Sequence, residues 1–130
     1  MRKSILFTVL ALGVCLTASA RAADRALQKY PDVLAAKVQA RAPGTFDFDV
    51  TVSSPYDTPQ RYADAFRVRS RDGTVYGERI LLHDHAGEQP FTRDLHGVRM
   101  PRGVRTVTVE ARDRQYGYGG KTVEVALPGR

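Results

Sequence analysis

The sequence predicts an antiparallel β-sandwich, and three observations support this fold class. Apolar and polar residues alternate over several short segments, and such alternation is typical of strands buried on one face. Turn signals rich in glycine, proline and aspartate separate these segments at intervals of about 8–12 residues, a spacing typical of sandwiches. The chain has 130 residues and a single cysteine. We therefore expect one all-β domain of about seven strands with no disulfide.

The clearest predicted strand covers residues 45–52, where the alternation has no fault. Phe46, Phe48, Val50 and Val52 fall on one face, and Asp47, Asp49 and Thr51 fall on the other. This pattern predicts a strand with one buried face. Weaker alternation predicts a preceding strand over residues 33–40, which a turn at residues 42–44 joins to it.

A hairpin is predicted between residues 63–70 and 74–82, around Asp72-Gly73. A two-residue loop would set Phe66 opposite Arg79. A three-residue loop over residues 71–73 instead pairs Ser70 with Thr74. That register puts the apolar residues Tyr62, Phe66, Val68, Tyr76, Ile80 and Leu82 on one face, although Asp64 and Glu78 share it. We prefer it because a one-residue slip would move the apolar set to solvent. The other face then carries Ala63, Ala65, Arg67, Arg69, Val75, Arg79, Leu81, His83 and His85.

Three further strands are predicted in the C-terminal part of the chain, over residues 91–95, 104–112 and 121–127. Their inward residues are Val107, Val109 and Ala111 in the second, and Val123, Val125 and Leu127 in the third. Turns are expected at residues 101–103 and 116–120, which are rich in glycine.

The first 22 residues are typical of a cleaved secretory signal peptide. A basic start at Arg2-Lys3 precedes an apolar run over residues 5–16, which is shorter than the ~20 residues that span a bilayer. Small residues allow cleavage after Ala20 or Ala22. Lipidation at Cys15 is disfavoured, because Val14 stands where a small residue is expected. We expect residues 23–31 to form an N-terminal segment, with a helical turn over 25–30, and residues 32–128 to form the sandwich.

Removing this segment changes the charge of the chain. The full sequence has 20 basic and 14 acidic side chains, a net charge of +6. Residues 1–22 hold three of the basic residues and no acidic one, which leaves 17 against 14, or +3. This modest charge and the predicted export argue against a nucleic-acid partner. The sequence has no G-x-S-x-G, no H-E-x-x-H and no cysteine after residue 22, so we expect no enzymatic activity.

Two stretches carry a resemblance to known proteins. Residues 95–113, followed by Gly117, Gly119-Gly120 and residues 122–125, resemble the last strands of bacterial immunoglobulin-like and fibronectin-III-like domains. Over most of its mature length the chain also resembles small exported bacterial proteins with an H-D-H-x-x-E-Q-P-F-T-R stretch, a group without an established activity. Antibody-type domains differ in having a tryptophan, a cysteine pair and a corner tyrosine. The resemblance therefore implies a sandwich without the disulfide.

His83-Asp84-His85 is the sharpest chemical motif. In a strand, side chains two residues apart point the same way, so both imidazoles can reach one Cu or Zn ion. Zinc usually takes three or four protein ligands, and His96 is the candidate third ligand, with Glu88 a fourth. In a simple hairpin centred on Glu88, His96 would lie on the opposite face. A one-residue shift would bring it to the histidine face, and a crossover between sheets would separate it. The alternative is that the histidines are polar strand residues whose charge depends on pH.

The arginines form a second candidate site. Arg67, Arg69 and Arg79 are predicted on the histidine face, where three cations disfavour a metal dication. Guanidinium groups bind carboxylates, phosphates and sulfates through paired hydrogen bonds, so the expected partners are an envelope protein, an anionic glycan or another anionic ligand. The alternative is that arginine on a solvated face reflects a chain with 16 arginines and four lysines. Glu88 and Arg93 complete the candidate ligand-binding set and are expected to pair.

We therefore expect an exported, non-enzymatic sandwich that acts as a binding or structural module, either periplasmic or secreted. The alternative is a periplasmic Cu- or Zn-binding protein that uses His83 and His85. No transmembrane segment is expected after cleavage.

Overall fold

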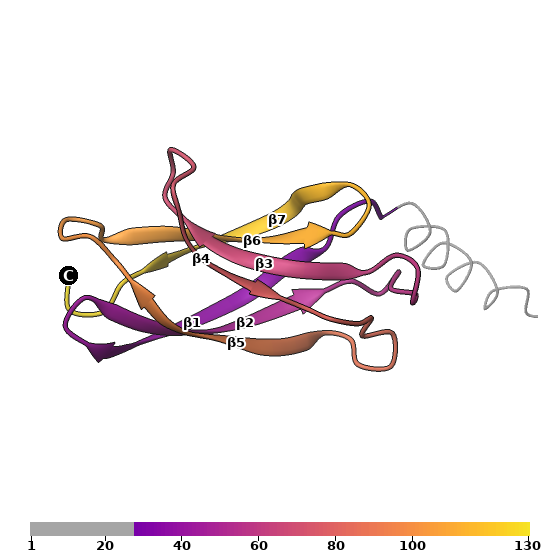
Figure 1. Cartoon of the computed structure of the whole chain (residues 1–130), viewed down its shortest axis with the longest axis horizontal. Helices are drawn as coiled ribbons and strands as arrows, with labels where there is room; N and C mark the ends of the chain where they lie inside the picture. The colour runs from indigo at the N-terminus through magenta and orange to yellow at the C-terminus, as the bar shows by residue number, and fades with distance from the viewer. Residues whose placement is uncertain (1–27) are drawn as a thin grey trace, which may run out of the picture.

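The computed structural model describes residues 28–130 and contains seven strands in two antiparallel sheets (Figure 1). The strands are β1 (Asp32–Ala42), β2 (Thr45–Ser53), β3 (Ala63–Arg69), β4 (Val75–Ile80), β5 (Phe91–Arg99), β6 (Thr106–Asp113) and β7 (Gly117–Ala126). One sheet has the order β1-β2-β5 and the other has the order β4-β3-β6-β7. The prediction of seven strands in an all-β chain is confirmed. The predicted signal peptide and residues 23–27 lie outside the described residues. Within residues 28–130 there is no helix with the length and hydropathy to cross a membrane.

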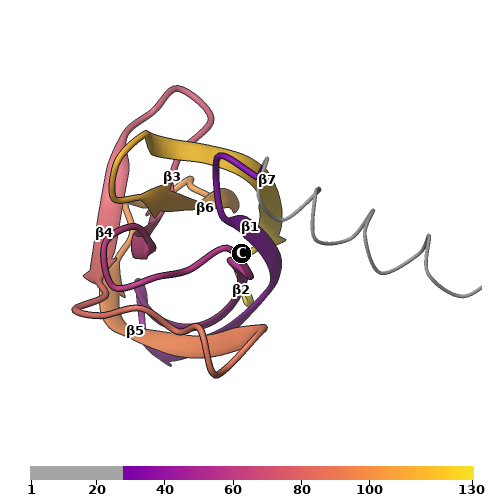
Figure 2. The same cartoon turned by 90° about the vertical axis from the view of Figure 1, so that its right-hand side faces the viewer.

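The core lies between the two sheets, which face each other in the end view of Figure 2. The alternation predicted for β2 is confirmed, because Phe46, Phe48, Val50 and Val52 are all buried. The inward residues predicted for the last two strands are confirmed as well: Val107, Val109, Ala111 and Leu127 are buried in the core, and Val123 and Val125 pack against it. Burying a side chain of this size contributes about 1.5–3 kcal/mol, so the period-two pattern determines which face of each strand turns inward.

The β3–β4 hairpin has the predicted loop but a different register along the strands. The Ser70 N–H donates to the Thr74 carbonyl (2.8 Å) across the loop, where Gly73 adopts a φ of 97°. Beyond it, Arg69 pairs with Val75 and Val68 pairs with Gly77, so Tyr76 is an extra residue in a β-bulge. A bulge places two residues opposite one and restores the register of a shorter loop.

Because of this bulge, the faces of β4 and of the loop after it differ from the predicted ones. Ile80 and Leu82 are 47% and 83% exposed, whereas Leu81 is buried, so the prediction that Ile80 and Leu82 turn inward is wrong. The two acidic residues that fitted poorly on the inward face also turn outward. Glu78 pairs with Arg67, and Asp64 is the extra residue of a second irregularity, between Ala63 and Ala65.

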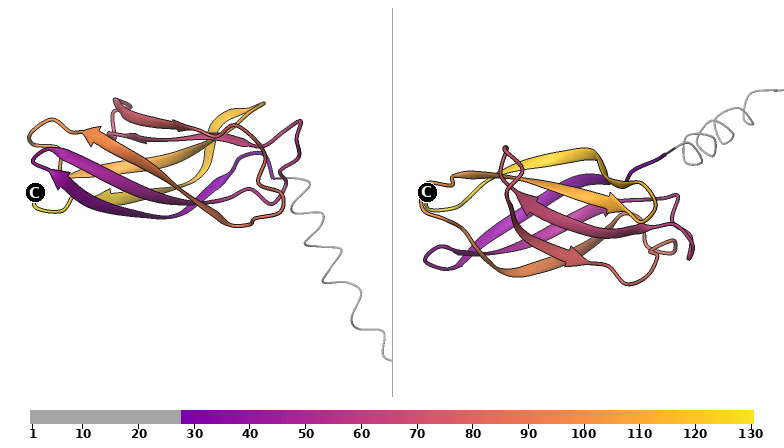
Figure 3. Two further views of the ribbon diagram at one scale, coloured as in Figure 1. Left: turned by 60° about the horizontal axis from the view of Figure 1, so that its bottom comes forward. Right: turned by 45° about the horizontal axis from the view of Figure 1, so that its top comes forward.

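The chain crosses from one sheet to the other between β4 and β5, so these strands do not form the simple hairpin. Apart from the β3–β4 loop, which projects from one side, the connections lie at the two ends of an elongated sandwich (Figures 1 and 3). Residues 28–31 and the β2–β3, β4–β5 and β6–β7 connections lie at one end, which we call the N-terminal end. The β1–β2 and β5–β6 connections and the C-terminus lie at the other, which we call the C-terminal end.

Candidate functional site

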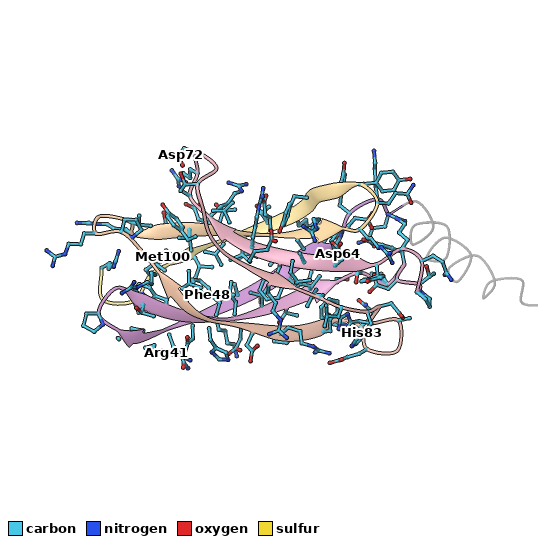
Figure 4. The ribbon with its side chains drawn as sticks, in the orientation of Figure 1. Arg41, Phe48, Asp64, Asp72, His83 and Met100 are labelled. Carbon is cyan, nitrogen blue, oxygen red and sulfur yellow. The ribbon has the colours of Figure 1, made fainter. Side chains whose placement is uncertain are left out.

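The two histidines of the H-D-H motif lie in the β4–β5 loop, and Figure 4 shows His83 at the N-terminal end. Their ring centroids are 4.9 Å apart. The His85 ring is buried and stacks on Phe91 at a centroid distance of 3.9 Å, with 13° between the planes. His83 is exposed, and its Nδ1 donates to the Asp84 carbonyl (2.8 Å). The motif therefore places one buried and one exposed imidazole side by side, but in a loop, because the strand predicted to carry them ends at Ile80.

Two side chains from the β2–β3 and β4–β5 loops hold this motif in place, and neither was predicted from the sequence. The buried Asp57 carboxylate accepts hydrogen bonds from the backbone N–H groups of Ala63 (3.1 Å) and His85 (3.0 Å). Burial raises the pKa of Asp57, and these donors oppose that shift. The Gln89 carboxamide donates to the His85 carbonyl (3.0 Å) and accepts from the Ser54 N–H (2.8 Å). The two loops are thus joined by buried hydrogen bonds, which fix the position of His85.

Arg79 and Arg93 line the same hollow as the histidines, a space of about 140 Å³. Each guanidinium already has a carboxylate partner. Arg79 Nη1 lies 2.5 Å from Asp94 Oδ1, and Arg93 Nη2 lies 2.8 Å from Glu88 Oε2, so the expected Glu88–Arg93 pair is confirmed. The hydrogen bond from Arg93 lowers the pKa of Glu88, and burial together with the Arg93 charge lowers the pKa of His85. The hollow is thus lined by two imidazoles and by two guanidinium groups whose charges are balanced by carboxylates.

His96 does not join the other two histidines. It lies on β5, where its Nε2 is 2.8 Å from Asp94 Oδ2 and its Nδ1 is 3.5 Å from Asp47 Oδ1. His96 lies five positions after Phe91 along β5, a distance of about 16 Å in extended backbone. Hydrogen bonds to Asp94 and Asp47 raise its pKa. Across residues 28–130, no three His, Cys, Asp or Glu side chains are grouped so that they can hold a metal ion.

Arg67 and Arg69 lie on the outer face of the four-stranded sheet, apart from Arg79. The prediction that all three share the histidine face is wrong, because Arg67 pairs with Glu78 and Arg79 is the next residue along β4, on the opposite face. Both Nε atoms of Arg67 and Arg69 approach the Glu110 carboxylate, at 2.6 and 3.0 Å. The Arg67 guanidinium also stacks on the Tyr118 ring at 3.7 Å. This face is therefore a compensated network rather than an open cationic surface.

A third group of arginines, at the C-terminal end, was not identified as a site from the sequence. Arg102, Gly103, Arg105 and Arg130 line a hollow of about 280 Å³ between the β5–β6 loop and the C-terminal segment. None of these three arginines forms an ion pair with a side-chain carboxylate of residues 28–130. The 101–103 turn was predicted, but no sequence signal brings Arg130 beside it.

Comparison with known proteins found one informative similarity. A protein of Halomicrobium mukohataei named "Putative lipoprotein" is 33% identical over 94 residues, which cover 72% of this chain and 46% of that protein. The chain thus spans less than half the length of this relative. No protein-family model matches the chain, and no solved structure matches it either.

Proposed function

We propose that this chain is an exported, non-enzymatic β-sandwich that acts as a binding module in the periplasm or cell envelope. Two independent features support export. Residues 1–22 have the basic start, apolar run and small residues of a signal peptide. The name of the Halomicrobium relative also assigns that protein to the lipoproteins.

We further propose that the sandwich is of the fibronectin-III-like type. In an immunoglobulin constant domain the fourth strand joins the sheet of the first two. Here β4 lies beside β3 in the second sheet, and β5 lies beside β2. This order supports the resemblance of residues 95–125 to fibronectin-III-like domains. Such domains serve many purposes, so the function has to be argued from the sites.

The observation that carries the binding role is the group of three arginines, Arg102, Arg105 and Arg130, that line one hollow at the C-terminal end. At the N-terminal end, Arg61 Nη2 donates to the carbonyls of Gln28 (3.0 Å) and Lys29 (2.6 Å) and so ties the N-terminal segment to the sandwich. At the C-terminal end, the three arginines that line the hollow of about 280 Å³ have no side-chain carboxylate partner among the described residues. An anionic glycan, an anionic lipid or an acidic protein has the complementary charge.

We propose that the histidine pair is a structural feature rather than a metal site. His85 is buried against Phe91, and His83 donates its Nδ1 proton to a backbone carbonyl. Two imidazoles also fall short of the three or four protein ligands that zinc usually takes.

Cell fractionation together with mass spectrometry of the purified protein tests this proposal. We expect the tagged protein in the periplasmic or envelope fraction, with a mature N-terminus after Ala20 or Ala22. The matched control is Leu10→Arg, which interrupts the apolar run and should keep the protein inside the cell. Retention of the uncut wild-type chain in the cytoplasm would contradict the proposal. A lipid on Cys15 would preserve the envelope location and contradict only the cleavage expected at Ala20 or Ala22.

A further inference from the structure

We propose that the hollow between Arg102, Arg105 and Arg130 binds a phosphate group carried by an envelope ligand. This inference rests on the proposed function for the location of the ligand, whereas the phosphate site itself rests on the geometry of the three arginines. The sequence left carboxylates, phosphates and sulfates as candidate ligands of the arginines, and the proposal selects phosphate.

Hydrogen bonds to backbone carbonyls hold the Arg130 guanidinium in place at this hollow. Its Nη1 donates to the carbonyls of Pro101 (2.5 Å) and Val104 (3.1 Å), and its Nη2 donates to the Met100 carbonyl (3.3 Å). The guanidinium also lies 5.2 Å from the centre of the Phe46 ring. These contacts hold the charge without neutralising it, because carbonyl groups supply dipoles and no counter-charge. Phosphate binding at Arg130 therefore costs little side-chain entropy.

Arg102 and Arg105 bring two more charges to the same hollow. The Val104 N–H donates to the Pro101 carbonyl (3.3 Å) and closes the turn that presents Arg102. The Arg105 carbonyl accepts from the Leu127 N–H (2.8 Å), which joins this turn to the C-terminal segment. Both residues are exposed. One guanidinium group held by backbone carbonyls and two exposed ones thus line a common space.

Charge and hydrogen-bond capacity favour a phosphate monoester in this space. A phosphate monoester carries about −1.5 to −2 charges at pH 7 and offers three acceptor oxygens. A carboxylate carries a single charge and satisfies one guanidinium through two hydrogen bonds. Three guanidinium groups without a side-chain carboxylate partner therefore match a phosphate better than a carboxylate. Eight of the other ten arginines of residues 28–130 have carboxylate partners, and the two exceptions, Arg99 and Arg114, do not line this hollow.

A second hollow of about 290 Å³ shares Arg130 with the first and has a different lining. Its lining includes Pro43, Phe46 and Pro128, together with Arg41, and Arg41 is paired with Asp47. Each hollow is close to the lower limit of about 300 Å³ for small-molecule sites. A ligand whose phosphate lies among the arginines can therefore place an attached sugar or glycerol unit over this less charged surface.

The test measures binding of one head group in two forms by the full chain as purified after expression. Isothermal titration with glycerol phosphate probes the soluble form, with glycerol as the neutral control. Co-sedimentation with phosphatidylcholine vesicles, with and without phosphatidic acid, probes the same group on a membrane. The test variant is Arg102→Gln/Arg105→Gln. The control is Arg71→Gln/Arg114→Gln, which removes the same charge from two exposed positions outside the hollow.

We expect saturable binding that weakens as ionic strength rises, and about a tenfold or greater loss of affinity in the test variant. The control variant should bind as the wild type does. Binding of both probes indicates that the phosphate group suffices, and binding to vesicles alone indicates a membrane ligand. Arg130→Gln should also weaken binding, and its thermal midpoint shows whether the C-terminal segment stays in place.

Either of two results would overturn the phosphate site. The first is the absence of binding to both probes. The second is an equal loss in test and control variants, which would show attraction to net charge alone. Neither result bears on export, because fractionation tests that separately.

Discussion

The His85 imidazole lies almost parallel to the Phe91 ring, with the ring centroids 3.9 Å apart. His85 belongs to the loop that leaves the four-stranded sheet, and Phe91 begins β5 in the other sheet. The contact therefore closes the core at the point where the chain crosses between the sheets. It also keeps the imidazole out of water, and burial lowers the pKa of His85.

The stability of the fold should decrease as His85 becomes protonated. The pKa of His85 is lower in the fold than its value of about 6.5 in an unfolded chain, so the unfolded state binds the proton more readily. The stabilisation is present above about pH 6.5 and is lost as pH falls toward the lowered value. His85→Phe should keep the stacking contact and remove this decrease in stability at low pH. Unfolding in urea at about pH 5 and about pH 7.5 measures the difference between the two proteins.

Histidine resonances in NMR spectra provide a second check of the same assignment. We expect His85 to titrate below about 6.5 and His96, whose pKa the Asp94 and Asp47 carboxylates raise, to titrate above it. The His96 contribution to stability has the opposite sign, being present at low pH and lost as pH rises. A normal titration of His85 would mean that its ring is solvated rather than stacked on Phe91.

Asp113 should be among the polar residues most sensitive to substitution. Its fully buried carboxylate accepts hydrogen bonds from the Tyr56 hydroxyl (2.7 Å) and from the backbone N–H groups of Gln115 and Tyr116 (2.9 Å each), and it pairs with Arg61 (3.2 Å). Asp113→Asn replaces an acceptor oxygen with a donor group and leaves Arg61 without a counter-charge. We expect a loss of about 3 kcal/mol in the free energy of unfolding.

The control for this substitution is Asp49→Asn on the exposed face of β2. Within residues 28–130 the Asp49 side chain forms no ion pair and no hydrogen bond, so its change should stay within about 0.5 kcal/mol. Equal effects of the two substitutions in urea unfolding would show that the Asp113 network contributes little.

Gly120 should not tolerate a side chain, because β7 passes directly over the N-terminal segment. Gly120 has a φ of 78°, and a Cβ there would overlap the Pro31 carbonyl oxygen. Gly73 has a φ of 97° with open space around it. Gly73→Ala should therefore cost about 1–2 kcal/mol for the backbone conformation alone, and Gly120→Ala should cost about 3 kcal/mol or more. Thermal denaturation of both variants makes the comparison, and similar costs would contradict the close approach of β7 to Pro31.

Metal binding at the histidine pair should be weak. Two imidazoles without a third ligand, next to Arg79 and Arg93, offer a poor site for Cu(II) or Zn(II). Calorimetric titration of either ion should give at most millimolar binding, and His83→Ala/His85→Ala should change it little. Stoichiometric submicromolar binding that this double variant abolishes would support the metal-binding alternative and contradict this expectation.

The strands were predictable because burial on one face leaves a period of two in the sequence. Phe46 to Val52 show this directly. The bulge at Tyr76 was not predictable, because no residue type or pattern in the sequence marks an extra residue in a strand. The sequence indicated the bulge only through the poor fit of Asp64 and Glu78 on the predicted inward face.

The candidate sites were less predictable because they depend on contacts between distant segments. His83 and His85 are close together because they are two positions apart in one loop, although the strand predicted to carry them ends at Ile80. Arg105 and Arg130 are 25 positions apart in the sequence, and they meet because β6 and β7 pair in antiparallel fashion and return the chain to the same end. Likewise, the pairing of Arg67 and Arg69 with Glu110 depends on the register of β3 against β6.

Mapping of backbone amide shifts by NMR during titration with glycerol phosphate tests most directly where the molecule binds its ligand. We expect saturable shifts confined to Arg102–Arg105 and the segment ending at Arg130, with Arg67, Arg69 and the histidine loop unchanged. Saturable shifts centred on Arg79, His83 and Arg93, or on the outer face at Arg67 and Arg69, would contradict binding at the C-terminal end.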